Sequence, residues 1–406
     1  MALPFVLSRY LRPFLKSEGS RECLYDNGIL ARVESLTPLQ AALVEALWHD
    51  DSAEDRLAEL AQTASRDELR AALTDLYDRA LIFESHAAAD ALFHRLRAAL
   101  CPEIPFVDQI ELTSHCPMRC GFCPRGIPGR MQRPAGFMDL ALYQRLLSQL
   151  NPQQHEQRPI ELHHLGESLL HPQLARFVAL ASERGLSTEL SVNPSLLTPE
   201  RMRQLLDAGI ARLVLSLDGL RDETLVRIRG PAARYRQAEA HIAELLAEVA
   251  RRGSAAPQIV VQMIALAANR AEQDAFLARF SQTGLPTVRA YLKPLDGPDP
   301  DCSAQAAEPL RYLCSYPFRS VVVLWDGRVV PCCRDDDAHL VLGDLHHQTL
   351  AELWSGPAAR ELRRRHRSSE FPVGHLCHGC AWSPAAFTAS HAARHPSRAS
   401  PAPLQW

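Results

Sequence analysis

The sequence predicts an α/β fold in which a parallel sheet curls into a barrel or partial barrel. From about residue 107 onward, strand-like runs alternate with helical runs, as in successive βα units, whose strands lie parallel. Six strands are expected, at 107–113, 158–164, 187–192, 211–217, 257–264 and 287–292. Helices are expected between them, at about 139–150, 172–184, 199–208, 233–252 and 270–282.

Residues 1–98 are predicted to form a small separate unit ahead of the barrel. The run "RECLYDNGILARVE" predicts a hairpin, because "DNG" supplies a turn with positive φ. Capping boxes at Thr37–Gln40 and Ser65–Glu68 predict two helix starts, with a further helix over about 53–62. "ALIFES" then predicts a short strand. A hairpin, three helices and a strand together indicate a winged-helix-like α+β unit.

Size and charge narrow the class of protein. A chain of 406 residues is long enough for two or three domains. The net charge of −3 gives no overall attraction to nucleic acid or to an anionic membrane. The helix that begins after Ser65 carries three arginines against four acidic residues, which suits phosphate contacts poorly. With no signal peptide and no spanning apolar run, we expect a cytoplasmic protein without nucleic-acid or membrane partners.

Three of the eleven cysteines stand close together just after the first predicted strand. Cys116, Cys120 and Cys123 have the spacing C-x3-C-x2-C, at the strand end where ligand sites of such sheets lie. Three thiolates on one loop could hold three irons of a [4Fe–4S] cluster and leave the fourth iron open, with the Phe122 ring placed for stacking on an adenine. The alternatives are a zinc site that lacks a ligand, or cysteines without a shared role.

A second cysteine set follows a change of pattern near residue 297. "FRSVVVLWDGRVVPCC" predicts a β-hairpin with Asp326-Gly327 at its turn, and two helices and "CHGC" follow. Four thiolates suit either zinc or a fully ligated iron–sulfur cluster. The expected ligands are Cys314, Cys332, Cys377 and Cys380. Cys333 competes with Cys332, which we prefer because it completes the pattern G-x4-C. Cys23, Cys101 and Cys302 are expected to be ordinary thiols.

The cysteine loop and its surroundings resemble the radical S-adenosylmethionine (SAM) superfamily. The shared pattern is C-x3-C-x-aromatic-C after the first strand, followed here by "MQRPAGFMD" at 131–139. The resemblance implies a partial (β/α)6 TIM-like barrel, a SAM-binding [4Fe–4S] cluster and reductive cleavage of SAM to a 5′-deoxyadenosyl radical, which abstracts a hydrogen atom from the substrate. It also implies SAM contacts from Phe122, Gly166, Glu167, Asn193, Ser216, Asp218 and Arg229. The chain departs from the family at Leu165 and Ser168, where relatives have glycine and proline.

The frame "GRVVPCCRD", "GDL", "LAELW" and "CHGC" resembles the SPASM/Twitch extension of radical SAM enzymes. Because no cysteine follows Cys380, the resemblance is to the single-cluster Twitch type, with zinc as the alternative. An auxiliary [4Fe–4S] cluster of this kind implies electron transfer, either from a substrate radical or toward the first cluster. A flavodoxin- or ferredoxin-type protein is the implied electron donor.

Residues 1–98 resemble the winged-helix peptide-recognition modules fused to peptide-maturing radical SAM enzymes. Such a module binds a leader peptide as an added strand; a stabilising appendage is the alternative. We therefore expect an enzyme that oxidises or crosslinks a ribosomally made precursor peptide. The alternatives are a small-molecule dehydrogenase that oxidises an amino-sugar or cyclitol alcohol, and a non-catalytic iron–sulfur protein.

The expected domain boundaries follow from these patterns. They are 1–98 for the peptide-recognition module, 104–297 for the barrel, 298–385 for the auxiliary-cluster domain and 386–406 for a disordered tail. The sequence does not single out a catalytic acid or base, because His163, His164, Gln262 and Lys293 are equally suited to line the pocket.

Overall fold

The computed structural model describes most of the chain between residues 6 and 380. The described residues are 6–7, 11–16, 20–26, 31–48, 59–60, 62–79, 81–83, 88, 92, 101–155, 158–295, 314, 316–368, 371–378 and 380. They belong to two compact units. The barrel unit takes its described residues from 102–307 and 320–362, and the terminal unit takes its own from 1–101, 308–319 and 363–405.

Six parallel strands form the centre of the barrel unit, and each lies where the sequence predicts it. They are β6 (Phe106–Ile110), β7 (Ile160–Glu161), β8 (Thr188–Val192), β9 (Arg212–Ser216), β10 (Gln258–Ala265) and β11 (Val288–Pro294). Each strand pairs in parallel with the next one along the chain. The predicted α/β fold with a parallel sheet is therefore confirmed.

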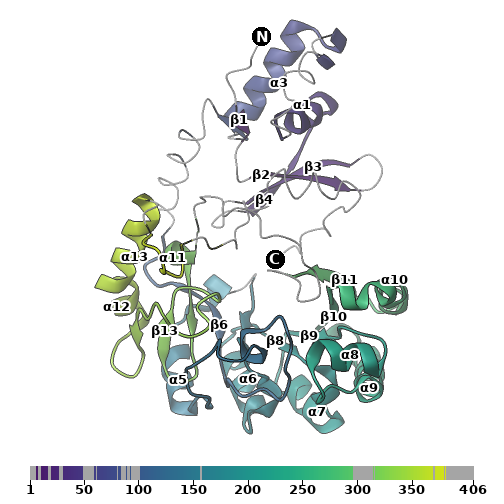
Figure 1. Cartoon of the computed structure of the whole chain (residues 1–406), viewed down its shortest axis with the longest axis vertical. Coiled ribbons are helices and arrows are strands. Elements are labelled where there is room, and N and C mark those ends of the chain that lie inside the picture. Colours follow the sequence, from purple (N-terminus) through teal and green to yellow (C-terminus); the bar gives the residue numbers. More distant parts are fainter. Residues whose placement is uncertain are drawn as a thin grey trace. The chain divides into compact units, whose positions relative to one another are not determined.

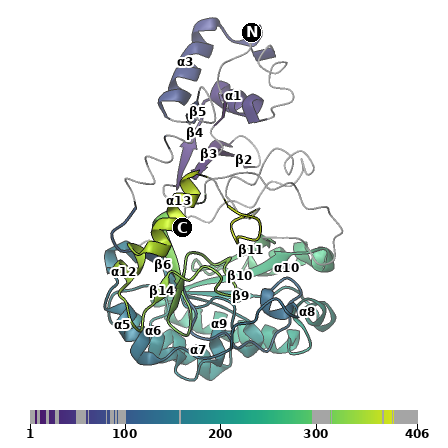
Figure 2. The ribbon, with the colours of Figure 1, turned by 60° about the vertical axis from the view of Figure 1, so that its left-hand side comes forward.

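Helices cover the outer face of this curved sheet, as Figures 1 and 2 both show for α6, α7 and α9. The helices are α5 (Leu140–Leu147), α6 (Leu174–Ser182), α7 (Pro199–Asp207), α8 (Asp222–Arg229), α9 (Tyr235–Arg252) and α10 (Gln273–Phe280). All but α8 were expected. Outward-facing strand residues such as Leu213, Leu215 and Val261 are fully buried, which places the main core between sheet and helices.

Short 3₁₀ helices shape the loops of the barrel unit. They are η2 (Pro124–Gly126), η3 (Pro152–His155), η4 (Ser168–Leu170), η5 (Pro194–Leu196), η6 (Gly253–Ala255) and η7 (Ala267–Glu272). Of these, η2, η4 and η5 follow β6, β7 and β8, so the chain turns sharply at the carboxyl ends of three neighbouring strands.

The predicted hairpin after residue 316 is also present, and it extends the barrel sheet. Strands β12 (Ser320–Val323), β13 (Arg328–Val330) and β14 (Gly343–Asp344) pair antiparallel in sequence, with Gly327 at φ +86° in the turn. Strand β12 also pairs in parallel with β6, so the sheet has nine strands. Trp354, in α12 (Leu350–Trp354), donates from Nε1 to the Pro102 carbonyl at 2.8 Å.

The terminal unit contains an antiparallel sheet and a helical pair. The sheet has the order β2 (Leu11–Lys16), β3 (Ser20–Asp26) and β4 (Ala31–Ser35), and β1 (Val6–Leu7) pairs with β5 (Ile82–Phe83). The β3–β4 hairpin and the β5 strand confirm predictions, whereas β2 was not expected. Two further helices complete the described elements: α11 (Tyr316–Arg319) in this unit, and α13 (Pro357–Ser368), whose residues divide between the two units.

Helices α1 (Pro38–Trp48) and α3 (Arg66–Asp78) begin at the two predicted capping boxes. The Thr37 amide donates to Gln40 Oε1 at 2.9 Å, and the Ser65 amide donates to Glu68 Oε2 at 2.8 Å. The helices bury a core of Leu43, Val44, Leu73, Leu76, Leu81 and Ile82. Most of the predicted helix 53–62, Cys302 and the tail 386–406 lie outside the described residues.

Candidate active site

The loop that carries the first cysteine trio is tightly folded directly after β6. The Cys123 amide donates to the Cys120 carbonyl at 3.0 Å, and the Gly126 amide donates to the Cys123 carbonyl at 2.8 Å. A Cβ at Gly126 would lie 2.2 Å from the Cys120 carbonyl oxygen, so only glycine allows this turn. Cys120 is buried, and Cys116 and Cys123 are half-buried. The backbone therefore fixes three thiols on one short loop.

Burial is the main influence on the thiols of Cys116 and Cys120. It raises the pKa of Cys116 to about 12, and it raises the pKa of Cys120 even though the Arg229 guanidinium opposes the rise. Iron or zinc binding would therefore release protons from this loop. Among the described residues, no three His, Cys, Asp or Glu side chains are grouped as a single metal ion requires. A four-iron cluster makes a different demand, because each thiolate binds its own iron.

Gly166 and Glu167 lie against the cysteine loop. A Cβ at Gly166 would stand 1.8 Å from the Thr113 carbonyl oxygen, and the Glu167 amide donates to the His115 carbonyl at 2.8 Å. The Glu167 carboxylate is buried and accepts from the amides of Leu169 at 3.1 Å and Asn193 at 2.9 Å. Burial nevertheless raises the pKa of Glu167 to about 7. A cation placed beside this carboxylate would reverse that shift.

Asp218 and Arg229 form a buried ion pair beside the same loop. Arg229 Nε donates to Asp218 Oδ2 at 2.7 Å, and the Ile264 amide donates to the other carboxylate oxygen at 2.8 Å. The Arg119 amide donates to the Arg229 carbonyl at 2.9 Å, and the Arg229 guanidinium lies 5.9 Å from the centre of the Phe122 ring. The pair therefore ties α8, which sequence reasoning missed, to the cysteine loop.

Asn193 offers an unsatisfied donor at the end of β8. Its Oδ1 accepts from the amide and hydroxyl of Ser195, both at 2.9 Å. Its Nδ2 is buried and has no hydrogen-bond partner among the described residues. Buried polar groups are rarely left unpaired, so this amide fits a bound ligand. The thiol set, the close backbone approach at Gly166 and the free Asn193 donor all fit a cluster with a SAM molecule on it.

Ser216 faces a different group of residues. Its hydroxyl lies 3.1 Å from Ser191 Oγ and accepts from Gln262 Nε2 at 2.9 Å, while the Tyr291 hydroxyl donates to Gln262 Oε1 at 2.7 Å. These side chains line the concave side of the sheet across β8–β11. Ser216 therefore lies in the wall of the barrel, bonded to Ser191 and Gln262, and its contact with SAM stays a prediction.

A second row of polar side chains continues this wall, and sequence reasoning missed it. Gln109, Glu161, Glu189 and Arg212 stand opposite one another on β6, β7, β8 and β9. Glu189 pairs with Arg212, and burial together with Glu161 raises the pKa of Glu189 to about 7. The available signal was the presence of polar side chains within these strands, since buried parallel strands are usually apolar throughout.

The two adjacent histidines after β7 contact different strands. His163 Nδ1 accepts from the Ser191 amide at 3.2 Å, and His164 Nδ1 lies 2.8 Å from Gln109 Oε1. Burial lowers the pKa of both, that of His164 to about 4. Both rings are therefore neutral near pH 7 and add no positive charge to this part of the barrel.

A buried network joins the loop after the cysteine trio to the segment after Cys332 and Cys333. Arg133 donates two hydrogen bonds to the Glu111 carboxylate, at 2.7 and 2.5 Å, and a third to the Asp336 carbonyl at 2.8 Å. Arg130 donates to Asp336 Oδ2 at 2.9 Å, and the amide of Arg133 donates to Asp337 Oδ1 at 2.7 Å. We call residues 111, 130–133 and 335–337 the arginine lock.

The second cysteine set divides between the two units. Cys332 and Cys333 follow β13 in the barrel unit, where the Asp335 amide donates to the Cys332 carbonyl at 3.2 Å. Cys314, Cys377 and Cys380 belong to the terminal unit. The four-cysteine ligand set therefore stays a prediction from the sequence.

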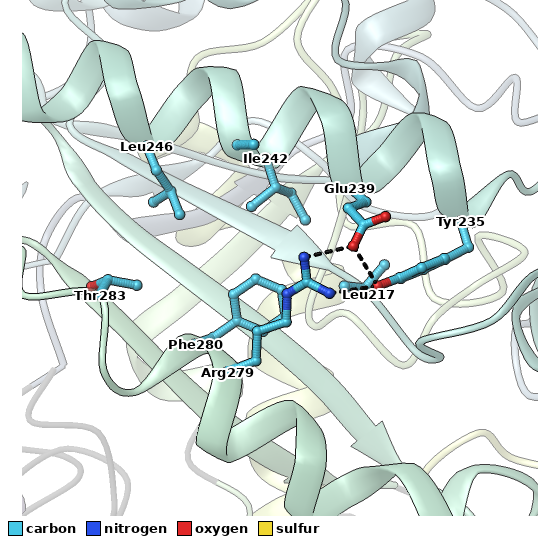
Figure 3. A pocket seen from close by; sticks show the side chains of 9 residues that line it. Leu217, Tyr235, Glu239, Ile242, Leu246, Arg279, Phe280 and Thr283 are labelled. Carbon is cyan, nitrogen blue, oxygen red and sulfur yellow. Dashed lines mark hydrogen bonds and ion pairs between the residues drawn. The ribbon is translucent and has the colours of Figure 1, made fainter.

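A pocket lies in the helical layer between α9 and α10 (Figure 3). Figure 3 shows Tyr235, Glu239 and Arg279 joined by hydrogen bonds and an ion pair. Thr283 and five apolar side chains line the rest, among them Leu217, whose neighbour Asp218 belongs to the predicted site. No predicted ligand of SAM or iron lines this pocket. We therefore regard it as a gap in helix packing.

Two family models match the chain. The radical SAM superfamily model matches residues 110–255, and the SPASM model, an iron–sulfur cluster-binding domain, matches residues 314–381. The first match contains the cysteine trio and all the predicted SAM contacts. The second contains all four predicted ligands of the auxiliary cluster.

Two sequence relatives and one solved structure resemble different parts of the chain. The PqqA peptide cyclase of Bradyrhizobium diazoefficiens is 30% identical over 128 residues, which cover 31% of this chain but only 32% of the cyclase. The SAM-dependent 2-deoxy-scyllo-inosamine dehydrogenase of Niallia circulans is 23% identical over 67% of this chain and 91% of its own length. Streptococcus suis SuiB, bound to its precursor peptide SuiA, shares the fold over 93% of each chain at 12% identity and a TM-score of 0.50.

Proposed function

Because the chain carries a radical SAM domain and a SPASM iron–sulfur domain, we propose that it oxidises or crosslinks a ribosomally made precursor peptide. The two domains account for three cofactors: a [4Fe–4S] cluster, SAM and an auxiliary iron–sulfur cluster. When bound, the first cluster and SAM supply a 5′-deoxyadenosyl radical that abstracts a hydrogen atom. No helix among the described residues has both the length and the apolar character needed to cross a membrane.

The observation that carries the peptide proposal is the antiparallel sheet of the terminal unit. Among the described residues, β2 and β4 each pair only with β3, so each has one side without a strand partner. Such a strand can accept an extended peptide through main-chain hydrogen bonds. We propose that the winged-helix-like residues 1–98 bind a leader in this way. SuiB, whose fold spans most of this chain, is bound to a precursor peptide in its own structure.

We propose that Cys116, Cys120 and Cys123 hold the SAM-binding cluster. Glu167, as a carboxylate, would bind the amino group of SAM, and the Asn193 Nδ2 donor would bind one of its oxygens. Gly166 lets the segment after β7 approach Thr113 closely, which would place Glu167 beside the cysteine loop and the bound SAM. The Asp218–Arg229 pair, with its link to Phe122, would position the loop.

The auxiliary cluster completes the proposed chemistry. Its proposed ligands are Cys314, Cys332, Cys377 and Cys380. Four thiolates leave no open iron, so electron transfer is the role that suits such a cluster.

The second candidate is a dehydrogenase that acts on an amino-cyclitol alcohol. The polar wall of Gln109, Ser191, Ser216 and Gln262 favours it, because amide and hydroxyl groups suit a polyol. The 2-deoxy-scyllo-inosamine dehydrogenase also matches over most of its length. This candidate gives the unpaired strands of the terminal sheet no role, so we place it second.

One set of anaerobic measurements separates these functions. The reconstituted protein is incubated with SAM and dithionite, and 5′-deoxyadenosine is quantified with and without each substrate. A precursor encoded beside the gene should bind the full chain and be modified, whereas the same peptide with a scrambled leader should do neither. Turnover of 2-deoxy-scyllo-inosamine without peptide binding would favour the dehydrogenase. No 5′-deoxyadenosine under any condition would refute both.

A further inference from the structure

Glu161 is a carboxylate on the concave face of the barrel sheet that has no cationic partner. It ends β7 and stands in one row with Gln109 and Glu189 on the neighbouring strands. Its side chain is mostly buried, with 21% exposed. Its Oε2 accepts from Gln109 Nε2 at 2.6 Å and lies 3.5 Å from His163 Nε2. Among the described residues, no hydrogen bond or ion pair reaches its other oxygen, Oε1.

Both groups that contact this carboxylate are neutral. Gln109 is an uncharged amide. His163 Nδ1 accepts from the Ser191 amide at 3.2 Å, so the ring proton is on Nε2, which faces Glu161. Burial lowers the pKa of His163, which keeps this ring neutral near pH 7. The charge of Glu161 is therefore held by neutral donors alone.

The cations nearby do not neutralise Glu161. Arg212 pairs with Glu189 instead. Lys293 is exposed, and within the described part of the chain it forms no ion pair with either glutamate. Glu189 adds repulsion, because Glu161 contributes, after burial, to the raised pKa of Glu189. A mostly buried charge is normally paired, so this arrangement lacks a cation.

A second acceptor beside Gln109 also lacks a donor. Because Gln109 donates from Nε2 to Glu161, its Oε1 is the acceptor for His164 Nδ1 at 2.8 Å. The lone pair of the neutral His164 ring is therefore on Nε2, which is buried and has no hydrogen-bond partner among the described residues. Buried polar groups are rarely left unpaired. Glu161 and His164 thus adjoin the same amide, and each has an acceptor that a bound ligand can satisfy.

The carboxylate fits a primary ammonium group better than a guanidinium. An ammonium is a compact charge with three donors on a flexible stem, whereas arginine binds a carboxylate through two parallel hydrogen bonds to both oxygens. Glu161 offers only Oε1, because Gln109 occupies Oε2. The depth of this row leaves room for such a stem. Glu189, beside Glu161, precedes Asn193 by four residues, which places the row about 13 Å from the predicted SAM contact at Asn193.

We propose that Glu161 determines substrate specificity by binding a primary ammonium group of the substrate inside the barrel. The proposal rests on the proposed function, in which the ammonium belongs to a lysine side chain of the precursor peptide. An amino-cyclitol carries the same chemical group and is the alternative source. No covalent bond forms: an N–H of the ammonium donates to Glu161 Oε1, and a further donor of the substrate satisfies His164 Nε2.

The first test needs no turnover. The Tm of the reconstituted full chain is measured against the concentration of n-butylammonium chloride, with n-butylguanidinium chloride and n-butanol for comparison at equal ionic strength. A solute that binds the folded state raises Tm with its concentration. n-Butylammonium should raise Tm more than the other two solutes do, and Glu161→Gln should abolish that difference. This variant leaves no buried cation unpaired, so the chain should still fold.

The matched control is Glu183→Gln, which makes the same change at an exposed glutamate paired with Arg176. It should respond to n-butylammonium like the unaltered chain. Equal Tm shifts for all three solutes in the unaltered chain would overturn the proposal. An undiminished n-butylammonium shift in Glu161→Gln would do the same.

The second test identifies the source of the ammonium group. Substrate-dependent formation of 5′-deoxyadenosine is measured with the precursor peptide, with the same peptide whose core lysines are changed to glutamine, and with 2-deoxy-scyllo-inosamine. Glu161→Gln should lower kcat/KM for the ammonium substrate on the order of tenfold to a hundredfold, the usual effect of losing a hydrogen bond to a charged group. The glutamine peptide should react equally slowly with the unaltered chain and with Glu161→Gln, because both then lack the contact.

The outcomes distinguish this proposal from the proposed function. A precursor modified at full rate without a core lysine would overturn the lysine contact, as would equal kcat/KM for Glu161→Gln and the unaltered chain. A dependence on Glu161 with 2-deoxy-scyllo-inosamine alone would support the ammonium contact and assign it to the amino-cyclitol. Absence of SAM cleavage with dithionite in the unaltered chain would refute the proposed function, whereas the n-butylammonium result does not depend on turnover.

Discussion

Replacement of Glu111 by Gln should break the arginine lock and destabilise the barrel unit strongly. The side chains of Arg133 and Glu111 are 2% and 0% exposed, and both terminal nitrogens of Arg133 donate to the carboxylate. Glu111→Gln removes the countercharge but leaves the buried guanidinium in place. Removal of one partner of a buried pair costs about 3–5 kcal/mol, because the remaining charge is left uncompensated. Such a loss is a large share of the roughly 5–15 kcal/mol that stabilises a typical domain.

The assays are urea and thermal unfolding of the apo protein, with hydrogen exchange as a local readout. Glu111→Gln should lower Tm on the order of 10 °C for a unit of this size. It should also speed exchange at His339 and Leu340, whose amides donate to Asp335 of the lock. These amides report on the segment after Cys332, which the lock fixes in place.

Two comparisons make the reasoning refutable. Glu183→Gln breaks the exposed pair with Arg176 and should cost at most about 1 kcal/mol. The double variant E111Q/R133M removes both buried charges and should recover most of the loss. If Glu111→Gln costs no more than Glu183→Gln, or if the double variant is less stable than the single one, the lock does not stabilise this region as described.

Three further predictions concern the site and its pH dependence. Gly166→Ala should abolish SAM binding, because its Cβ would lie 1.8 Å from the Thr113 carbonyl oxygen; calorimetry that detects normal binding would contradict this. Replacement of the three loop cysteines by alanine should remove about half of the chemically assayed iron, because the auxiliary cluster keeps its own ligands; loss of all the iron would count against two separate sites. Burial lowers the pKa of His155 to about 4, so the folded state favours the neutral ring. The contribution of this ring to the free energy of unfolding is therefore fully present above pH 6.5 and is lost as the pH falls toward 4. From this group the free energy of unfolding should fall by about 2 kcal/mol between pH 7.5 and 5; His155→Phe should remove that part, and an unchanged pH profile in urea titrations would refute the assignment.

Much of the barrel was predictable because its signals are local. Each strand of the six-stranded part lies in a short run that alternates with a helical run, and each capping box is a pattern of four residues. Helix α8 was missed because its nine-residue neighbourhood "LRDETLVRI" is highly charged and its position depends on distant partners. Asp222 accepts the Tyr235 amide at 2.7 Å, and Arg229 pairs with Asp218. These contacts are tertiary, and no local sequence pattern predicts them.

In the site, too, the features set by local sequence were predictable and those set by tertiary contacts were not. The cysteine spacing and the glycine of the Gly166–Glu167 segment could be predicted from the sequence, because the local backbone requires them. The partners of Asp218 and Ser216 could not, because strand register decides which side chains meet. The structure shows Asp218 paired with Arg229 and Ser216 bonded to Gln262, while the contact of both residues with SAM stays a prediction.

The parallel pairing of β12 with β6 has a consequence for how the chain reaches its folded state. Ser320 donates to Asp108 across 212 residues, so the first barrel strand lacks this partner until a segment made much later in synthesis is available. Until then one side of β6 lacks its neighbour and can pair with other chains. Contacts this distant in sequence also form slowly. Folding of this sheet is therefore complete only after β12 has docked on β6, and the yield of soluble protein depends on how that interval is protected.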